Sequence, residues 1–208
     1  MISTPVQYYP NRMVQIILQA MEEVLGHNEV TGVLNQAHLP DRIHKDRPGD
    51  QDGKFHFNYV GRVQTALEGA YGSRAGGGLS VRVGRACVKY GLREFGSELG
   101  ITDLGFRLLP LPTRLKVGSK ALAEFFNKFT DQSVRLEVND KQIFWHIERC
   151  PLCLESREDG PCCSMTVGFL QEALYWVSGG KTFLVEEKKC IACGDNDCTI
   201  VMEQVAVL

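Results

Sequence analysis

Apolar residues recur at helical spacing along the first 130 residues of the chain. Over residues 11–25 they stand three or four positions apart, which places them on one face of a helix, and Gly26 follows as a stop signal. The same spacing predicts helices over residues 29–37, 55–71 and 79–95. This part of the chain is therefore expected to be mainly helical.

Three stretches interrupt the helical pattern. Residues 40–54 are rich in Asp, Arg, Pro and Gly and predict an exposed loop. The glycine-rich segment 72–78 predicts a flexible turn between helices. A phosphate-binding loop is the alternative, but no strand clearly precedes the segment, and no GxxxxGK[ST] or GxGxxG motif is present. Residues 108–112 contain two prolines and predict an extended linker, after which Ser119 is expected to cap a helix that ends at Phe129.

The hydrophobic period changes from helical to two after residue 130. Apolar and polar residues alternate over residues 134–138 and 143–147. The turn sequence Asn139-Asp140-Lys141 joins the two segments, which predicts a β-hairpin.

One further helix and two strands complete the pattern. Helical spacing over residues 165–177 ends at Gly179-Gly180, a sequence typical of a left-handed cap. Strands are expected over residues 182–186 and 199–205. Helices packed on a small antiparallel sheet with one crossover helix define an α+β fold.

Composition narrows the class of protein. The 208 residues fit a single domain, residues 1–208, mainly helical over 1–130 and strand-rich over 131–205. A net charge of -2 argues against a nucleic-acid partner, since nucleic-acid binders usually carry a strongly basic face. No secretory signal and no membrane span are evident, so a cytoplasmic protein is expected.

The chain has eight cysteines, and all except Cys87 lie in its last third. In a reducing cytoplasm they are expected to be thiols or metal ligands rather than disulfides. Two C-x-x-C pairs, Cys150 with Cys153 and Cys190 with Cys193, have the spacing of a tetrahedral zinc site. A four-iron four-sulfur cluster is the alternative, since it also uses four thiolates. Neither pair has the βαβ setting of a thioredoxin-like redox motif.

Residues 163–201 carry three specific motifs. They are Gly168-Phe169-Leu170, Trp176-Val177-Ser178-Gly179-Gly180 and Glu187-x-x-Cys190-x-x-x-Gly194-Asp195-x-x-Cys198. Together they resemble the C-terminal signature of the 4-vinyl-reductase-like small-molecule-binding domain. That family includes a bacteriochlorophyll-biosynthesis protein, archaeal hydrocarbon-binding proteins and sensor domains that bind aromatic effectors. The resemblance implies a fold similar to vesicle-tethering complex subunits, and a homodimer.

The resemblance also implies a ligand set for one metal ion. Carried over position by position, the ligands of the family's zinc site are Cys163, Glu187, Cys190 and Cys198. The sequence departs from the sensor members in four further cysteines, which make it more similar to the photosynthesis-linked branch and leave zinc and a four-iron four-sulfur cluster both open. These secondary candidates are Cys150, Cys153, Cys162 and Cys193.

The function expected from these observations is binding of a hydrophobic small molecule by a metal-stapled domain. The resemblance favours a tetrapyrrole carrier or assembly factor linked to photosynthetic pigment metabolism. Candidate pocket residues are Phe126, Trp145, His146 and Trp176, although aromatic residues at such spacing also build ordinary cores. The alternatives are an iron-sulfur-dependent reductase of a tetrapyrrole vinyl group and a protein-docking adaptor. No dinucleotide fingerprint is present, so no catalytic residue is assigned.

Overall fold

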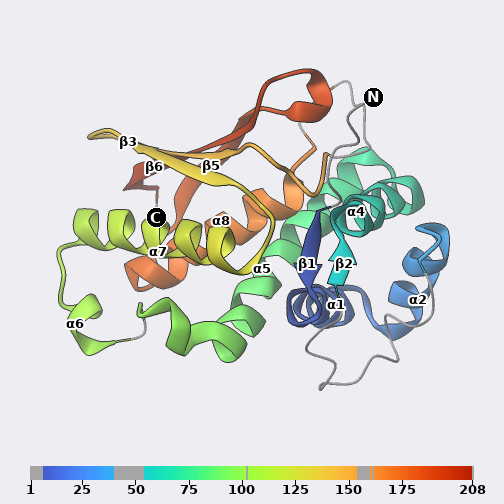
Figure 1. Ribbon diagram of the computed structural model, residues 1–208, viewed down its shortest axis with the longest axis horizontal. Coiled ribbons are helices and arrows are strands. Elements are labelled where there is room, and N and C mark those ends of the chain that lie inside the picture. Colours follow the sequence, from blue (N-terminus) through green and yellow to red (C-terminus); the bar gives the residue numbers. More distant parts are fainter. Residues whose placement is uncertain (1–6, 40–53, 102, 154–159, 161, 208) are drawn as a thin grey trace.

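The computed structural model describes residues 7–39, 54–101, 103–153, 160 and 162–207, and these form an α+β fold, as the sequence predicts (Figure 1). The helices are α1 (Asn11–Leu25), α2 (His27–Gln36), α4 (Phe57–Tyr71), α5 (Ser73–Leu99), α6 (Leu104–Arg107), α7 (Leu111–Phe129) and α8 (Ser164–Ser178). The strands are β1 (Tyr8–Pro10), β2 (Lys54–His56), β3 (Val134–Val138), β4 (Gln142–Ile147), β5 (Phe183–Lys189) and β6 (Cys198–Ala206). None of the described helices is both long and apolar enough to cross a membrane.

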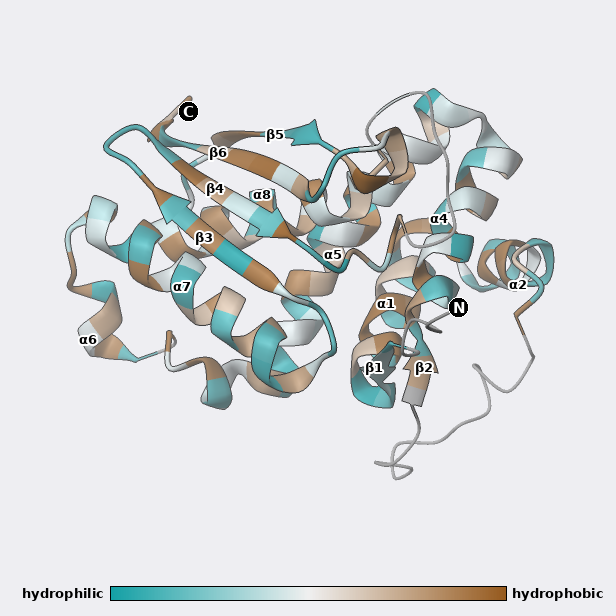
Figure 2. Cartoon of the chain, turned by 45° about the horizontal axis from the view of Figure 1, so that its top comes forward, coloured by the Kyte–Doolittle hydropathy of each residue, from teal (hydrophilic) through white to brown (hydrophobic). Residues whose placement is uncertain are grey.

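Two antiparallel sheets organise the chain. The larger sheet has the strand order β3-β4-β6-β5, and helix α8 lies between β4 and β5 along the chain. Helices α7 and α8 pack against this sheet, while α5 packs on α8 and α1 packs on α5 (Figures 1 and 2). Strands β1 and β2 pair beside α1. The apolar faces of α1, α5, α7 and α8 therefore point toward a shared interior.

Helices α5 and α8 approach each other closely because each presents a glycine at the crossing point. A Cβ atom on Gly84 would overlap the carbonyl oxygen of Met165, and a Cβ atom on Gly168 would overlap that of Val81. The two backbones therefore touch directly, with no side chain between them. The close approach fixes α8, and with it the loop that precedes α8, against the helical half.

The glycine-rich segment is not a flexible turn. Only Gly72, with φ +80°, separates α4 from α5, and Gly76 lies inside α5. A Cβ atom on Gly76 would collide with the backbone of Leu67 and Glu68 on α4. These glycines allow two helices to pack closely, which a single sequence cannot distinguish from a turn.

Helix α7 also begins earlier than predicted. It starts at Leu111, with Pro112 in its first turn, where a missing N–H costs nothing. Ser119 therefore lies buried in the middle of the helix instead of capping it. The loop predicted over residues 40–54 falls, except for Lys54, outside the described residues.

Several local predictions are confirmed. Helix α1 has the predicted bounds and ends at Gly26, whose φ is +91°. In the β3–β4 hairpin, Asn139 Oδ1 accepts the backbone N–H groups of Lys141 at 2.8 Å and Gln142 at 2.7 Å. Gly179 ends α8 in the left-handed conformation, as the sequence predicts.

Candidate functional site

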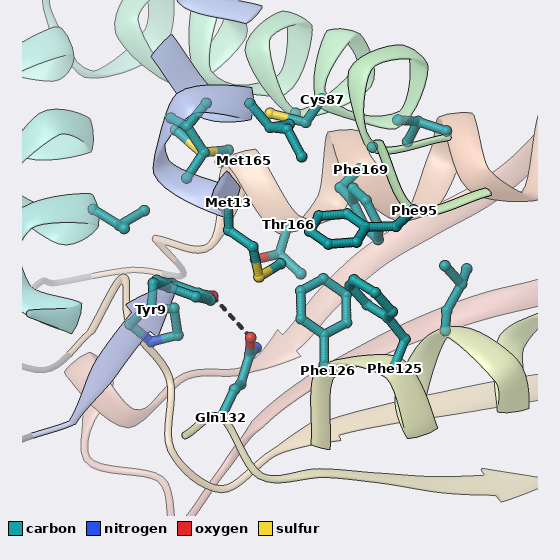
Figure 3. A pocket seen from close by; sticks show the side chains of 18 of the residues that line it. Tyr9, Met13, Cys87, Phe95, Phe125, Phe126, Gln132, Met165, Thr166 and Phe169 are labelled. Carbon is teal, nitrogen blue, oxygen red and sulfur yellow. Dashed lines mark hydrogen bonds between the residues drawn. The ribbon is translucent and has the colours of Figure 1, made fainter. Parts of the chain in front are cut away.

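A cavity of about 120 Å³ lies between α1, α5, α7 and α8 (Figure 3). Four phenylalanines give it an aromatic wall. The ring centroids of Phe95 and Phe125 lie 4.9 Å apart, and those of Phe126 and Phe169 lie 5.5 Å apart. Trp145 from β4 meets Phe126 edge-on at 6.1 Å. Aliphatic side chains and methionines complete the lining, so the cavity is predominantly apolar.

One end of the cavity is polar. Tyr9 Oη donates a hydrogen bond to Gln132 Oε1 at 2.8 Å (Figure 3). The buried Trp145 Nε1 has no hydrogen-bond partner among the described residues. Buried donors are nearly always paired in proteins. Trp145 lines the cavity, so its indole N–H is available to an acceptor there, and Gln132 lines the cavity as well.

The cavity carries no ionised group among the residues that line it. Burial raises the pKa of the Cys87 thiol to about 12, so this residue is an uncharged thiol at neutral pH. Burial likewise raises the pKa of Tyr9 above its usual range, and the phenol keeps its proton. A neutral ligand is therefore favoured over a charged one.

The four predicted pocket residues do not lie together. Phe126 and Trp145 line the cavity, whereas Trp176 lines a separate hollow beside Phe106. His146 lies in β4, where its Nδ1 is 3.1 Å from Asp197 Oδ2, and it lines neither space. The sequence prediction missed Tyr9 and Gln132, because their hydrogen bond joins residues 123 positions apart and no local pattern marks either one.

A cluster of six thiols lies close to the cavity. Between its members, Sγ–Sγ distances are 3.3 Å for Cys153–Cys163, 3.4 Å for Cys150–Cys163, Cys153–Cys162 and Cys153–Cys198, and 3.5 Å for Cys153–Cys190. All six side chains are buried, whereas Cys193 is exposed. The six come from three parts of the chain: the segment after β4, the two residues before α8, and the stretch from the β5–β6 loop to the first residue of β6.

Glu187 stands at the edge of the thiol cluster. Its Oε2 accepts the backbone N–H of Cys163 at 2.7 Å, and its buried Oε1 has no partner among the described residues. Burial raises the pKa of this carboxyl to about 8, against the opposing hydrogen bond from Cys163. The ligand atoms of the predicted metal-binding set lie within 4.8 Å of one another. This set is Cys163, Glu187, Cys190 and Cys198.

Two other sets of four converge as closely. They are Cys150, Cys153, Cys163 and Cys198, and Cys153, Cys162, Cys163 and Cys190. None of these sets combines Cys150 and Cys153 with Cys190 and Cys193, because the Cys193 side chain is exposed. The geometry therefore brings together six of the seven C-terminal cysteines without selecting one set of four.

No family model matches the chain. No curated protein matches it either. Solved structures do match in fold. An H-NOX protein from S. oneidensis in the Fe(II)NO ligation state has a TM-score of 0.60 at 11% identity, with 93% of this chain and 98% of that one covered. A mutant of T. Tengcongensis H-NOX has a TM-score of 0.55 at 14% identity, covering 94% and 97%. The phenol-responsive sensory domain of the transcription activator PoxR, with phenol, has a TM-score of 0.52 at 19% identity, covering 83% and 88%.

These neighbours correct the family expectation. The structures reported above are H-NOX domains and a phenol-responsive sensory domain, so the assignment to the 4-vinyl-reductase-like family is wrong. The tetrapyrrole carrier of photosynthetic pigment metabolism, which depended on that assignment, is wrong with it. Zinc and a four-iron four-sulfur cluster also lose their support, because the H-NOX structures are described with heme and Fe(II). The motifs misled because residues 163–201 form only one helix and two strands of a larger fold.

Proposed function

We propose that this chain is a sensor domain that binds a small neutral aromatic molecule carrying one hydroxyl group. The observation that carries the proposal is the aromatic cavity lined by Gln132 and by Trp145, whose buried Nε1 has no partner among the described residues. An apolar wall alone would accept any apolar molecule of suitable size. The indole N–H of Trp145 adds a requirement for an acceptor atom.

The size of the cavity limits the ligand to about one ring. An engineered apolar cavity of about 150 Å³ in another protein binds benzene. The cavity here, about 120 Å³, is slightly smaller, so one benzene ring with a small substituent is the upper limit without repacking. Edge-to-face contacts with Phe126 and Phe169 would stabilise such a ring.

The polar end matches a hydroxyl group. A ligand oxygen has two lone pairs, which could accept from Trp145 Nε1 and Gln132 Nε2, and its proton could be donated to Tyr9 Oη. Tyr9 can accept because its own proton is already donated to Gln132. Phenol is the simplest molecule with this shape and this hydrogen-bonding pattern. The PoxR sensory domain, which shares the fold, is described with phenol, and this supports the proposal.

Heme, with which the H-NOX family is described, does not fit this cavity. A heme is a macrocycle several times the size of one benzene ring, and the cavity is too small for it. Heme iron is held by His, Cys thiolate, Tyr, or Met opposite His. No described histidine lines the cavity, Cys87 is a protonated thiol, and Tyr9 is bonded to Gln132. Met13 and Met165 are present, but the partner imidazole is not among the lining residues.

Calorimetric titration with phenol and with toluene tests the proposal. Toluene has nearly the same shape but no hydroxyl, so phenol is expected to bind three- to tenfold more tightly, roughly the contribution of one net hydrogen bond. Trp145→Phe should remove most of that preference and leave toluene binding little changed. Trp176→Phe, in the separate hollow, is the matched control and should keep the preference. Stoichiometric uptake of hemin, or no heat with either ring, would overturn the proposal.

A reducing compartment such as the cytoplasm is part of this proposal, because six thiols in contact would otherwise form disulfides readily. The homodimer stays a prediction, and light scattering on the purified chain would test it.

A further inference from the structure

A second hollow, of about 220 Å³, lies where α6, α7 and the end of α8 meet (Figure 1). Its walls are mainly apolar and include Phe106 of α6 with Trp176 and Val177 of α8. Two arginines, Arg107 and Arg114, also line it, and no acidic side chain is among the described lining residues. The hollow therefore combines an apolar surface with positive charge, unlike the cavity between α1, α5, α7 and α8.

Arg114 has an unpaired donor. Its Nε is buried, and no described residue accepts a hydrogen bond from it. Neither Arg107 nor Arg114 forms an ion pair with any residue that the structure describes. Buried donors are nearly always paired in proteins, and an unpaired donor costs more on a charged group than on a neutral one. An anion in the hollow would supply the missing acceptor.

The end of α8 does not by itself explain Arg114. Arg114 Nη1 lies 3.8 Å from the position that a Cβ atom on Gly179 would take, so its charge does oppose the helix dipole. However, the carbonyl oxygens of Tyr175 and Trp176 already accept the N–H groups of Gly180 at 2.8 Å and Gly179 at 3.2 Å. A helix end carries about half a negative charge, whereas two guanidinium groups carry two positive charges. The hollow therefore stays positive.

We propose that this hollow binds an aromatic carboxylate. The guanidinium group of Arg114 offers a planar fork of N–H donors that matches the two oxygens of a carboxylate. Phe106 and Trp176 offer ring faces and edges against which an aromatic ring packs. An inorganic anion such as phosphate would leave these apolar walls uncovered. The proposal concerns a site apart from the cavity and does not rest on the proposed function.

The size of the hollow fits this class of ligand. An apolar cavity of about 150 Å³ in another protein holds benzene. The hollow here, about 220 Å³, is larger, so it has room for one ring and a carboxylate group. Arg107 is exposed whereas Phe106 and Val177 are buried, so the charge lies toward the solvent and the ring can lie deeper.

Tryptophan fluorescence tests the proposal with benzoate as the probe. The chain has two tryptophans, and Trp145→Phe leaves Trp176 as the only one, so the emission then reports on the hollow alone. Benzoate should change this emission in a saturable way. Benzamide has nearly the same shape but no charge, and we expect it to bind about tenfold more weakly, the contribution of a charge-assisted hydrogen bond.

Three substitutions in this background locate the site. Arg114→Gln should weaken benzoate binding about tenfold and leave benzamide binding unchanged within about twofold. Arg107→Gln should weaken benzoate binding only about two- to threefold, because exposed ion pairs contribute little. Lys116→Gln removes the same charge from an exposed position on α7, outside the hollow, and should keep the affinity of the background.

Three results would overturn the proposal. They are the absence of a saturable response to benzoate, equal affinities for benzoate and benzamide, and a benzoate affinity that Arg114→Gln leaves unchanged. The first two readings require no change at Arg114, so they do not depend on whether that variant folds. Calorimetry with benzoate on the unmodified chain repeats the first measurement without Trp145→Phe.

Discussion

Gly84 lies where α5 touches the backbone of α8, and any side chain there would overlap the Met165 carbonyl oxygen. Because backbone cannot move aside as a flexible side chain can, Gly84→Ala is expected to lower the free energy of unfolding by about 3 kcal/mol, the upper end of ordinary overpacking costs. Gly78, also in α5, has open space around its Cβ position, so Gly78→Ala should raise stability by about 0.5–1 kcal/mol. Urea denaturation measures both. Equal effects of the two substitutions would contradict the close-packing explanation.

At the same scale, the sequence predicts the thiol cluster far better than the cavity. Six of the seven C-terminal cysteines do converge, because short spacings such as that of Cys150 and Cys153 already restrict where two thiols can lie. The number of ligand sets could not be predicted, since it depends on how three separate segments meet. Tyr9 and Gln132 carry no local signal, because their roles exist only once β1 lies beside the end of α7.

At the scale of elements, a hydrogen-bonded group connects β4 with the start of β6. Asp197 accepts a hydrogen bond from Thr199 Oγ1 at 2.6 Å and lies 3.1 Å from His146 Nδ1. Burial raises the pKa of Asp197, but the hydrogen bond from Thr199 and the interaction with His146 outweigh it and hold the pKa below its ordinary value of 3.8. The carboxylate therefore stabilises the fold above pH 3.8, and this contribution is lost as pH falls through the lowered pKa.

Asp197→Asn is accordingly expected to cost about 1 kcal/mol at pH 7, and the difference from the unmodified chain should shrink as the pH is lowered below 3.8. Denaturant unfolding at several pH values measures it. Asp140→Asn, at the exposed hairpin turn, is the control and should have little effect at any pH. A loss that is the same at neutral pH and well below the lowered pKa would show that the carboxylate charge is not the cause.

The sequence predicts elements well where the local residue pattern determines them, and poorly where packing against other helices determines their extent. Helix α1 and the β3–β4 hairpin follow from period and turn chemistry alone. Helix α5 was predicted to begin after the glycine cluster, because glycine weakens helices in isolation. Its full extent over Ser73–Leu99 depends on packing against α4 and α8, where only glycine fits. Tertiary contact therefore outweighed local propensity at these positions.

At the scale of the whole molecule, the cavity and the thiol cluster share one segment of chain. Pro151 and Leu152 line the cavity, and they stand between Cys150 and Cys153 of the cluster. A Cβ atom on Gly61 of α4 would lie 3.0 Å from the carbonyl oxygens of Pro151 and Leu152. Helix α4 therefore packs closely against this segment. Ordering of the cluster should therefore order one wall of the cavity.

The direct backbone contact of α5 and α8 has a consequence for motion. Helices separated by side chains can adjust gradually as rotamers change, but backbones already in contact at Gly84 and Gly168 have no such layer to compress. The α5–α8 pair is therefore expected to be rigid where it lines the cavity. Any ligand that enters must push aside the opposite side, formed by α1 and α7, where the intervening layer consists of methionine and phenylalanine side chains such as Met13 and Phe126.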